Sequence, residues 1–176
     1  MNRTEKLIAE YGTLPQESDR RREIVYDLGA ILSTEPDHPG VLSFLIEVVA
    51  DIEAFDLARV EATKSLRLWP PSDPETWRLA GAVLVSAVEH TDEDLVRQYA
   101  VMALSSYADD SVVHAALAEA VLGDPDPLVR DNALAALSEA GPSEGRAEVL
   151  RRMSTDPHLG HEATRILAGW ETRQAD

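Results

Sequence analysis

The sequence predicts an all-α fold in which pairs of helices stack into a solenoid. The main observation is an internal repeat: the segment LVRQYAVMAL at 95–104 returns thirty-three residues later as LVRDNALAAL at 128–137. Weaker copies flank these two, DLARVEATKSL at 56–66 upstream and a downstream segment that keeps the Asp-Pro pair at 156–157. Apolar side chains also recur at helical spacing between the turns. Self-similarity with a period of 30 to 38 residues is typical of stacked helix pairs.

The helices before the repeats are separated by glycine and proline. We expect a first helix over 3–11, ended by Gly12 and Pro15, and a second over 18–32. The turn TEPDHPG at 34–40 then precedes a strongly apolar helix over 41–52. The second and third helices therefore look like a divergent leading pair.

The turns inside the repeat region contain residues that stop one helix and start the next. In WPPSDP at 69–74 the prolines cannot continue a helix, while Ser72 or Asp73 can cap the helix that follows. GDPDP at 123–127 combines a terminating glycine, a capping aspartate and a first-turn proline. The predicted helices are 56–68, 74–88, 94–106, 111–122, 127–140, 143–153 and 157–170.

Three expectations about packing follow from this arrangement. The last helix has no partner, so it should cap the stack with Trp170 over the open end of the core, and 171–176 should be a polar tail. Trp77 continues an apolar face and should belong to the core. Leu104 and Leu137 are equivalent in the repeat and should both be buried on the first helix of their pairs.

The segments DPDPLVRDNALAAL at 124–137 and DEDLVRQYAVMAL at 92–104 resemble the HEAT-repeat family in its short bacterial form. That form shows an Asp-rich turn, an apolar-Arg step, and then alanine and leucine. The resemblance covers 56–170 and implies a right-handed α-solenoid of about four to five helix pairs. The chain 1–176 would then be a single domain, with 1–55 as divergent N-terminal helices.

The resemblance also implies a role for an arginine that recurs in the repeats. Arg59, Arg97 and Arg130 occupy this position, where they would donate hydrogen bonds to carbonyls or aspartates of neighbouring turns and so tie one repeat to the next. The alternative is a row of anion-binding arginines, which the many neighbouring carboxylates disfavour. Gly160 replaces the arginine in the last copy, as suits a terminal cap.

The charge of the chain is strongly negative and unevenly distributed. Sixteen Lys and Arg oppose 32 Asp and Glu, for a formal net charge of −16. The segment 23–57 contains eight acids and no base, and 68–129 contains eleven acids with only Arg78 and Arg97. Such a field repels nucleic-acid phosphates and anionic membranes and attracts cationic protein surfaces. The alternative is that the acidity serves solubility alone.

No motif in the sequence indicates catalysis or a cofactor. Cysteine is absent, the glycines are scattered, and no serine lies in a nucleophile elbow. His158 and His161 stand three apart on the last predicted helix near Asp156 and Glu162, a partial metal site at most, so no metal and no cofactor are expected. The N-terminus is charged and the longest uncharged apolar run, 79–88, is ten residues, which predicts a soluble cytoplasmic protein.

The leading hypothesis is a non-enzymatic, monomeric solenoid that binds a basic protein. The second helix of each pair is expected to line the concave surface, so the candidate contact residues come from these helices and the adjoining turns. They are Trp69, Asp73, Glu75, Glu89, Asp109, Asp110, His114 and Glu119. Trp69, beside two prolines in a turn, would act as an apolar anchor.

The sequence leaves several functions open. A small acidic solenoid suits a bacterial immunity protein that neutralises a cationic toxin such as a nuclease. A regulatory scaffold or adaptor would show the same charge map. The resemblance also extends to two enzyme classes, DNA glycosylases for alkylated bases and bilin lyases. A glycosylase needs a basic groove for phosphate, which this chain lacks, and the lyase has no residue evidence in its favour.

Overall fold

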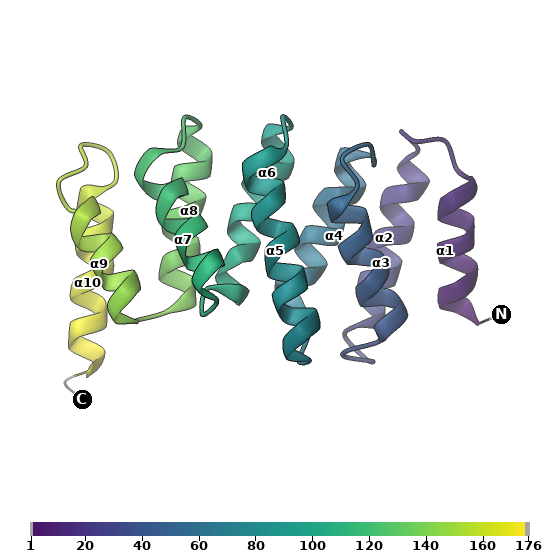
Figure 1. Ribbon diagram of the computed structural model, residues 1–176, viewed down its shortest axis with the longest axis horizontal. Helices are drawn as coiled ribbons and strands as arrows, with labels where there is room; N and C mark the ends of the chain where they lie inside the picture. Colours follow the sequence, from purple (N-terminus) through teal and green to yellow (C-terminus); the bar gives the residue numbers. More distant parts are fainter. Residues whose placement is uncertain (1, 175–176) are drawn as a thin grey trace.

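The computed structural model describes residues 2–174, which form ten α-helices and one short 3₁₀ helix, without a strand in that range. Figure 1 shows the helices standing side by side, with α1 at one end of an elongated stack and α10 at the other. The elements are α1 Arg3–Thr13, α2 Asp19–Ile31, α3 Pro39–Ala50, α4 Asp56–Leu68, α5 Pro74–His90, α6 Asp94–Ala103, η1 Leu104–Tyr107, α7 Ser111–Gly123, α8 Pro127–Ala140, α9 Glu144–Met153 and α10 Gly160–Gln174. The all-α solenoid of helix pairs is confirmed.

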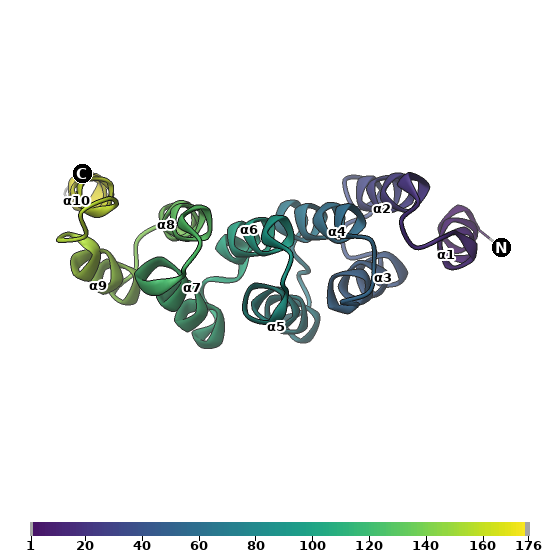
Figure 2. The ribbon, with the colours of Figure 1, turned by 90° about the horizontal axis from the view of Figure 1, so that it is seen from above.

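The helices form two layers. Figure 2 shows α2, α4, α6, α8 and α10 in one layer and α3, α5, α7 and α9 in the other, with α1 beside α2 at the N-terminal end. Contacts between successive helices from α2 to α8 are more extensive in the first layer than in the second. Because the first layer is more closely packed, the stack curves toward it and places it on the concave side (Figure 2). We call it the inner layer, and the other the outer layer.

This curvature corrects one expectation from the sequence. The second helices of the predicted pairs are α3, α5, α7 and α9, and they lie on the convex side rather than the concave one. The apolar pattern of a helix specifies which of its faces is buried, but not how closely it approaches the next helix of the same layer. The direction of curvature depends on this distance between neighbouring helices of one layer.

The core lies between the layers and runs through the whole stack. Leu104 and Leu137 are both fully buried, as their equivalence in the repeat predicts. Leu137 lies on α8, whereas Leu104 begins the 3₁₀ helix that follows α6, so the expectation that it lies on the first α-helix of its pair is not met. Trp77 is half-buried against the core, and Trp170 is buried on α10, where it covers the end of the stack as expected.

Several observed helix ends differ from the prediction by two to four residues, α1 and α10 among them. The helix α1 continues through Gly12 to Thr13, because a helical glycine costs only about 1 kcal/mol relative to alanine, and Leu14 before Pro15 is extended. The helix α10 begins at Gly160 rather than at 157, and it continues to Gln174. Residues 171–174 are therefore helical rather than a tail, while 175–176 lie outside the described residues.

The late start of α10 separates two histidines that were expected on one helix. The Asp156 carboxylate accepts hydrogen bonds from the backbone N–H groups of His158 and Leu159, at 2.9 Å each. These bonds hold a separate turn before the helix. His158 therefore lies in that turn and His161 in the helix.

The repeated arginines join successive turns along one edge of the stack, the edge formed by the turns that precede the inner-layer helices. Arg97 Nε donates to the Val88 carbonyl at 3.0 Å, and its Nη2 donates to Asp124 Oδ2 at 2.5 Å. Arg130 makes the same two bonds, to the Val121 carbonyl at 3.1 Å and to Asp156 Oδ2 at 2.5 Å. The predicted ties between repeats are confirmed, and we call each arginine with its two acceptors a rung.

The first rung differs from the other two. Arg59 Nη2 donates to the Val49 carbonyl at 3.2 Å, but its Nη1 donates to the hydroxyl of Thr91, at 3.0 Å, instead of to a carboxylate. Arg59 is only 1 % exposed, and burial lowers the pKa of its guanidinium.

In the last rung, hydrogen bonds from the Leu159 backbone and the Arg130 side chain lower the pKa of Asp156 to about 2.

The opposite edge is held by different side chains. The Tyr107 hydroxyl donates to the Leu66 carbonyl at 2.8 Å, and burial raises the pKa of this phenol. Arg146, also buried, donates to the Ala108 carbonyl at 3.2 Å. These bonds connect α4 to η1 and the residue after η1 to α9, so both edges of the stack are tied across repeats.

Candidate functional site

The eight residues predicted to contact a partner all lie on outer-layer helices or in the turns beside them. They do not form one site. Trp69, Asp73, Glu75, Asp109 and Asp110 lie at the edge where the outer-layer helices begin. Glu89 lies in the last turn of α5 near the opposite edge, and His114 and Glu119 lie along α7.

Two of the predicted carboxylates cap helices. Asp73 accepts hydrogen bonds from the backbone N–H and the hydroxyl of Thr76, both at 2.8 Å, and these bonds lower the pKa of Asp73. Asp110 accepts from the N–H groups of Val112 at 2.8 Å and Val113 at 3.3 Å. Both carboxylates are therefore used to start α5 and α7.

Two further predicted residues connect α7 and the turn before it to α9. Asp109 Oδ1 forms an ion pair with the buried Arg146, at 3.0 Å, while the rest of the Asp109 side chain stays exposed. His114 is half-buried against the backbone of α9: a Cβ added to Gly145 would lie 3.0 Å from its Nε2 atom. These residues hold the outer layer together.

Trp69 remains an exposed aromatic residue, as predicted. Its exposed fraction is 39 %, and its neighbour Leu68 is also exposed. Glu75 is exposed on the first turn of α5. Leu68 and Trp69 thus form a small exposed apolar area at the edge of the stack, apart from the groove described next.

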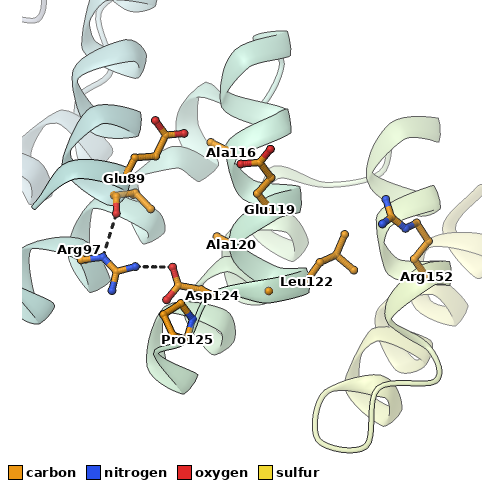
Figure 3. A pocket seen from close by; sticks show the side chains of 11 residues that line it. Glu89, Arg97, Ala116, Glu119, Ala120, Leu122, Asp124, Pro125 and Arg152 are labelled. Atoms are coloured by element: carbon orange, nitrogen blue, oxygen red, sulfur yellow. Dashed lines mark hydrogen bonds and ion pairs between the residues drawn. The ribbon is translucent and has the colours of Figure 1, made fainter.

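Glu89 and Glu119 line the same groove on the outer layer. The groove has a volume of about 560 Å³ and lies between the end of α5, the second half of α7 and α9 (Figure 3). We call it the Glu89–Glu119 groove. Its apolar lining is Val88, Ala116, Ala120, Leu122 and Pro125, and its charged lining is Glu89, Glu119, Arg97, Asp124 and Arg152.

The charges of this groove are only partly compensated. The Arg97–Asp124 pair of the second rung neutralises itself within the groove. Glu89 has only a contact of 3.9 Å with His90 Nδ1, and Glu119 forms no ion pair among residues 2–174. Figure 3 shows both carboxylates on the α5 and α7 side, with Arg152 across the groove on α9. The groove therefore has an acidic wall, an apolar floor and one opposing base.

Sequence reasoning missed Arg152 and the exposed face of the inner layer. Arg152 lies in the nearly neutral C-terminal segment, so the charge map gave no reason to select it. Leu95 and Leu128 are exposed at equivalent positions of α6 and α8. The repeat does pair these two positions, because each leucine begins an LVR triplet, so their equivalent environments could have been predicted from the sequence.

Neither a metal site nor a membrane span is found in the described part of the chain. No three His, Asp or Glu side chains among residues 2–174 lie close enough together to hold a metal ion. Glu162, next to His161, is paired instead with Arg165 at 2.5 Å. Within the same residues, every helix is too short or too polar to cross a bilayer.

Comparison with known proteins gives one result for the repeat region. A family model described as HEAT repeats matches residues 81–171, more than half of the 176-residue chain. No curated protein matches the chain.

Proposed function

The chain belongs to the HEAT-repeat family, and from this we propose that it is a non-enzymatic scaffold that binds a basic protein through the Glu89–Glu119 groove. HEAT-repeat solenoids are typically helical scaffolds for protein interaction rather than catalysts. The finer proposal, a basic partner at this groove, is supported by the charge and shape of the groove.

One observation carries the proposal: Glu89 and Glu119, from different helices, line one groove with an apolar floor, and neither pairs with a lysine or arginine among residues 2–174. A lysine or arginine of a partner could lay its methylene groups along Ala116 and Ala120 and place its charge between Glu89 and Glu119. The net charge of −16 would accelerate the encounter with such a partner.

A cationic toxin is one class of partner that fits this chemistry. An acidic protein of this kind would neutralise a nuclease by covering the basic surface that binds phosphate, as an immunity protein does. The charge alone supports this choice of partner. This choice is tested by measuring the affinity of the chain for any basic protein encoded beside its gene.

The adaptor alternative is favoured by a different observation. Leu95 and Leu128 are exposed near the starts of the inner-layer helices α6 and α8. A scaffold with exposed apolar side chains on one layer and an acidic groove on the other could hold two proteins at once. The DNA-glycosylase alternative is not supported, because the groove is acidic where phosphate binding requires bases.

The test compares two variants with the same change in net charge. In the first, Glu89→Gln is combined with Glu119→Gln. In the control, Glu35→Gln is combined with Glu53→Gln, at exposed carboxylates in turns away from the groove. Binding of a twelve-residue arginine-rich peptide is measured by calorimetry, and chemical-shift changes in ¹⁵N-labelled protein locate the site.

We expect the groove variant to bind the peptide at least about tenfold more weakly than the control, since a hydrogen bond to a charged group contributes about 1.5–3 kcal/mol. Shift changes should be concentrated at the end of α5 and along α7. Equal weakening in both variants would mean that net charge alone attracts the peptide, and the groove would lose its role.

A further inference from the structure

The inner layer is interrupted between α8 and α10. The helices α6 and α8 pack directly against each other, whereas α8 and α10 barely touch and α10 is held through α9. Figure 2 shows the wider separation of α8 and α10. A groove of about 450 Å³ lies between them and is lined by residues of both helices and of the turn before α10.

This α8–α10 groove has an apolar floor and an acidic rim. Its apolar residues are Leu134, Ala135, Leu159 and Ile166, and its acidic residues are Asp131, Glu139 and Glu162. No lysine or arginine lines it.

The rim carboxylates can be reached by a partner. Glu139 pairs with Arg67, and Glu162 with Arg165, but these side chains are 31–67 % exposed, so the pairs contribute little to stability. Asp131 is exposed and forms no ion pair within residues 2–174. A cationic side chain therefore meets one free carboxylate and two that it can share.

We propose that the α8–α10 groove docks a basic amphipathic helix of a partner protein. The two helices run in the same direction along the groove (Figure 1), so a helix laid between them would continue the side-by-side arrangement of the inner layer. Its apolar side chains, spaced at i, i+3 or i+4 and i+7, enter the groove over Ala135 and Ile166. Its lysines or arginines face Asp131 and the other rim carboxylates.

This surface is separate from the Glu89–Glu119 groove. The α8–α10 groove belongs to the inner layer and the Glu89–Glu119 groove to the outer layer, and they share no lining residue. Each can therefore be changed without changing the other. The choice of a basic occupant comes from the acidic rim, and the choice of a helix comes from the interrupted layer.

The test uses two peptides of eighteen residues made from leucine and lysine with identical composition. One has its leucines at helical spacing, and the other has a scrambled order. We expect the amphipathic peptide to bind at least tenfold more tightly than the scrambled one, with shift changes in ¹⁵N-labelled protein along α8 and α10. Equal binding of the two peptides would overturn the proposal.

Matched variants then locate the site. Ala135→Arg fills the groove and adds a base, while Ala82→Arg makes the same change at an exposed alanine of α5. We expect Ala135→Arg to weaken binding at least tenfold and Ala82→Arg to change it less than twofold. Asp131→Asn serves as a second, milder variant and should weaken binding about threefold to tenfold. Equal effects of the two arginine variants would overturn the proposal.

Two controls distinguish this docking site from the outer-layer groove and from self-association. Binding of the amphipathic peptide should persist when Glu89 and Glu119 are changed to glutamine, and its loss there would assign the peptide to the outer-layer groove instead. Sedimentation velocity tests whether a second copy of the chain fills the α8–α10 groove. A wild-type dimer that Ala135→Arg dissociates would assign the groove to self-association and overturn the proposal.

Discussion

The first arginine rung lacks the carboxylate that the other two have, and Thr91→Asp should supply it. Thr91 and Asp124 each stand six residues before the arginine of the following repeat, so they are equivalent in the turn. The Thr91 hydroxyl lies 3.0 Å from Arg59 Nη1. An aspartate at this position would give Arg59 the same kind of ion pair that Arg97 forms with Asp124.

The size of the effect follows from the burial of Arg59. The Thr91 hydroxyl already accepts from a charged donor, the Arg59 guanidinium, so the substitution changes the acceptor from a neutral group to an oppositely charged one. Arg59 is only 1 % exposed, so the attraction between the buried guanidinium and the new carboxylate is weakly screened and should stabilise the fold. Repulsion from the exposed acids Asp92, Glu93 and Asp94 opposes the gain and is screened by solvent. The net expectation is a stabilisation of about 1 kcal/mol.

The assay is urea unfolding followed by far-ultraviolet circular dichroism. The transition midpoint should rise for Thr91→Asp while the slope stays unchanged, because the surface exposed on unfolding is the same. Thr91→Asn provides a neutral side chain of the same shape as aspartate. Thr91→Val removes the hydrogen-bond acceptor of Arg59, which should lower the free energy of unfolding by about 1–3 kcal/mol. If Thr91→Asp is no more stable than Thr91→Asn, the carboxylate is not what the first rung lacks.

Three further predictions concern packing and pH. Leu137→Ala should lower the free energy of unfolding by about 2–5 kcal/mol in urea, because the side chain is fully buried; a loss below about half a kcal/mol would contradict the repeat register. Gly29→Ala should cost about 1–3 kcal/mol, since its Cβ would lie 2.1 Å from Ser65 Oγ and 2.9 Å from Ser65 Cβ, and Ser65→Gly in the same chain should restore most of the loss. The pKa of Asp156, about 2 against an ordinary value of 3.8, means that its contribution to stability is complete above pH 4 and is lost as the pH falls toward 2. Asp156→Asn should therefore lose less stability than the wild type between pH 4 and pH 2, and identical losses would show that this carboxylate has no such role.

The sequence was informative wherever a feature repeats. The equivalence of Leu104 and Leu137 predicted two buried sites, and the recurrent arginine predicted the rungs, because each copy repeats the same local environment. Features that depend on the distance between copies were not predictable. The inner layer, the interruption between α8 and α10, and the convergence of Glu89 with Glu119 all result from how far neighbouring helices lie apart.

The acidic residues show the same limit in another way. Asp73 and Asp110 were selected as contact residues because they are acidic and lie in turns, and the structure gives them hydrogen bonds that start helices. A capping aspartate and a partner-binding aspartate look alike in a turn, since both follow a break and precede a helix. Only the direction of the carboxylate separates them.

The rungs have a consequence for how such a chain can lengthen. The second rung takes its donor, Arg97, from the start of α6 and its carboxylate, Asp124, from the turn after α7, so residues 94–126 contain both. An in-frame duplication of these 33 residues would therefore bring its own donor and its own carboxylate. At the last copy Gly160 stands where the arginine would be, and a Cβ there would lie 2.6 Å from the Ser154 carbonyl oxygen. New units can therefore be inherited between existing ones, whereas growth beyond α10 would require a different backbone at its first residue.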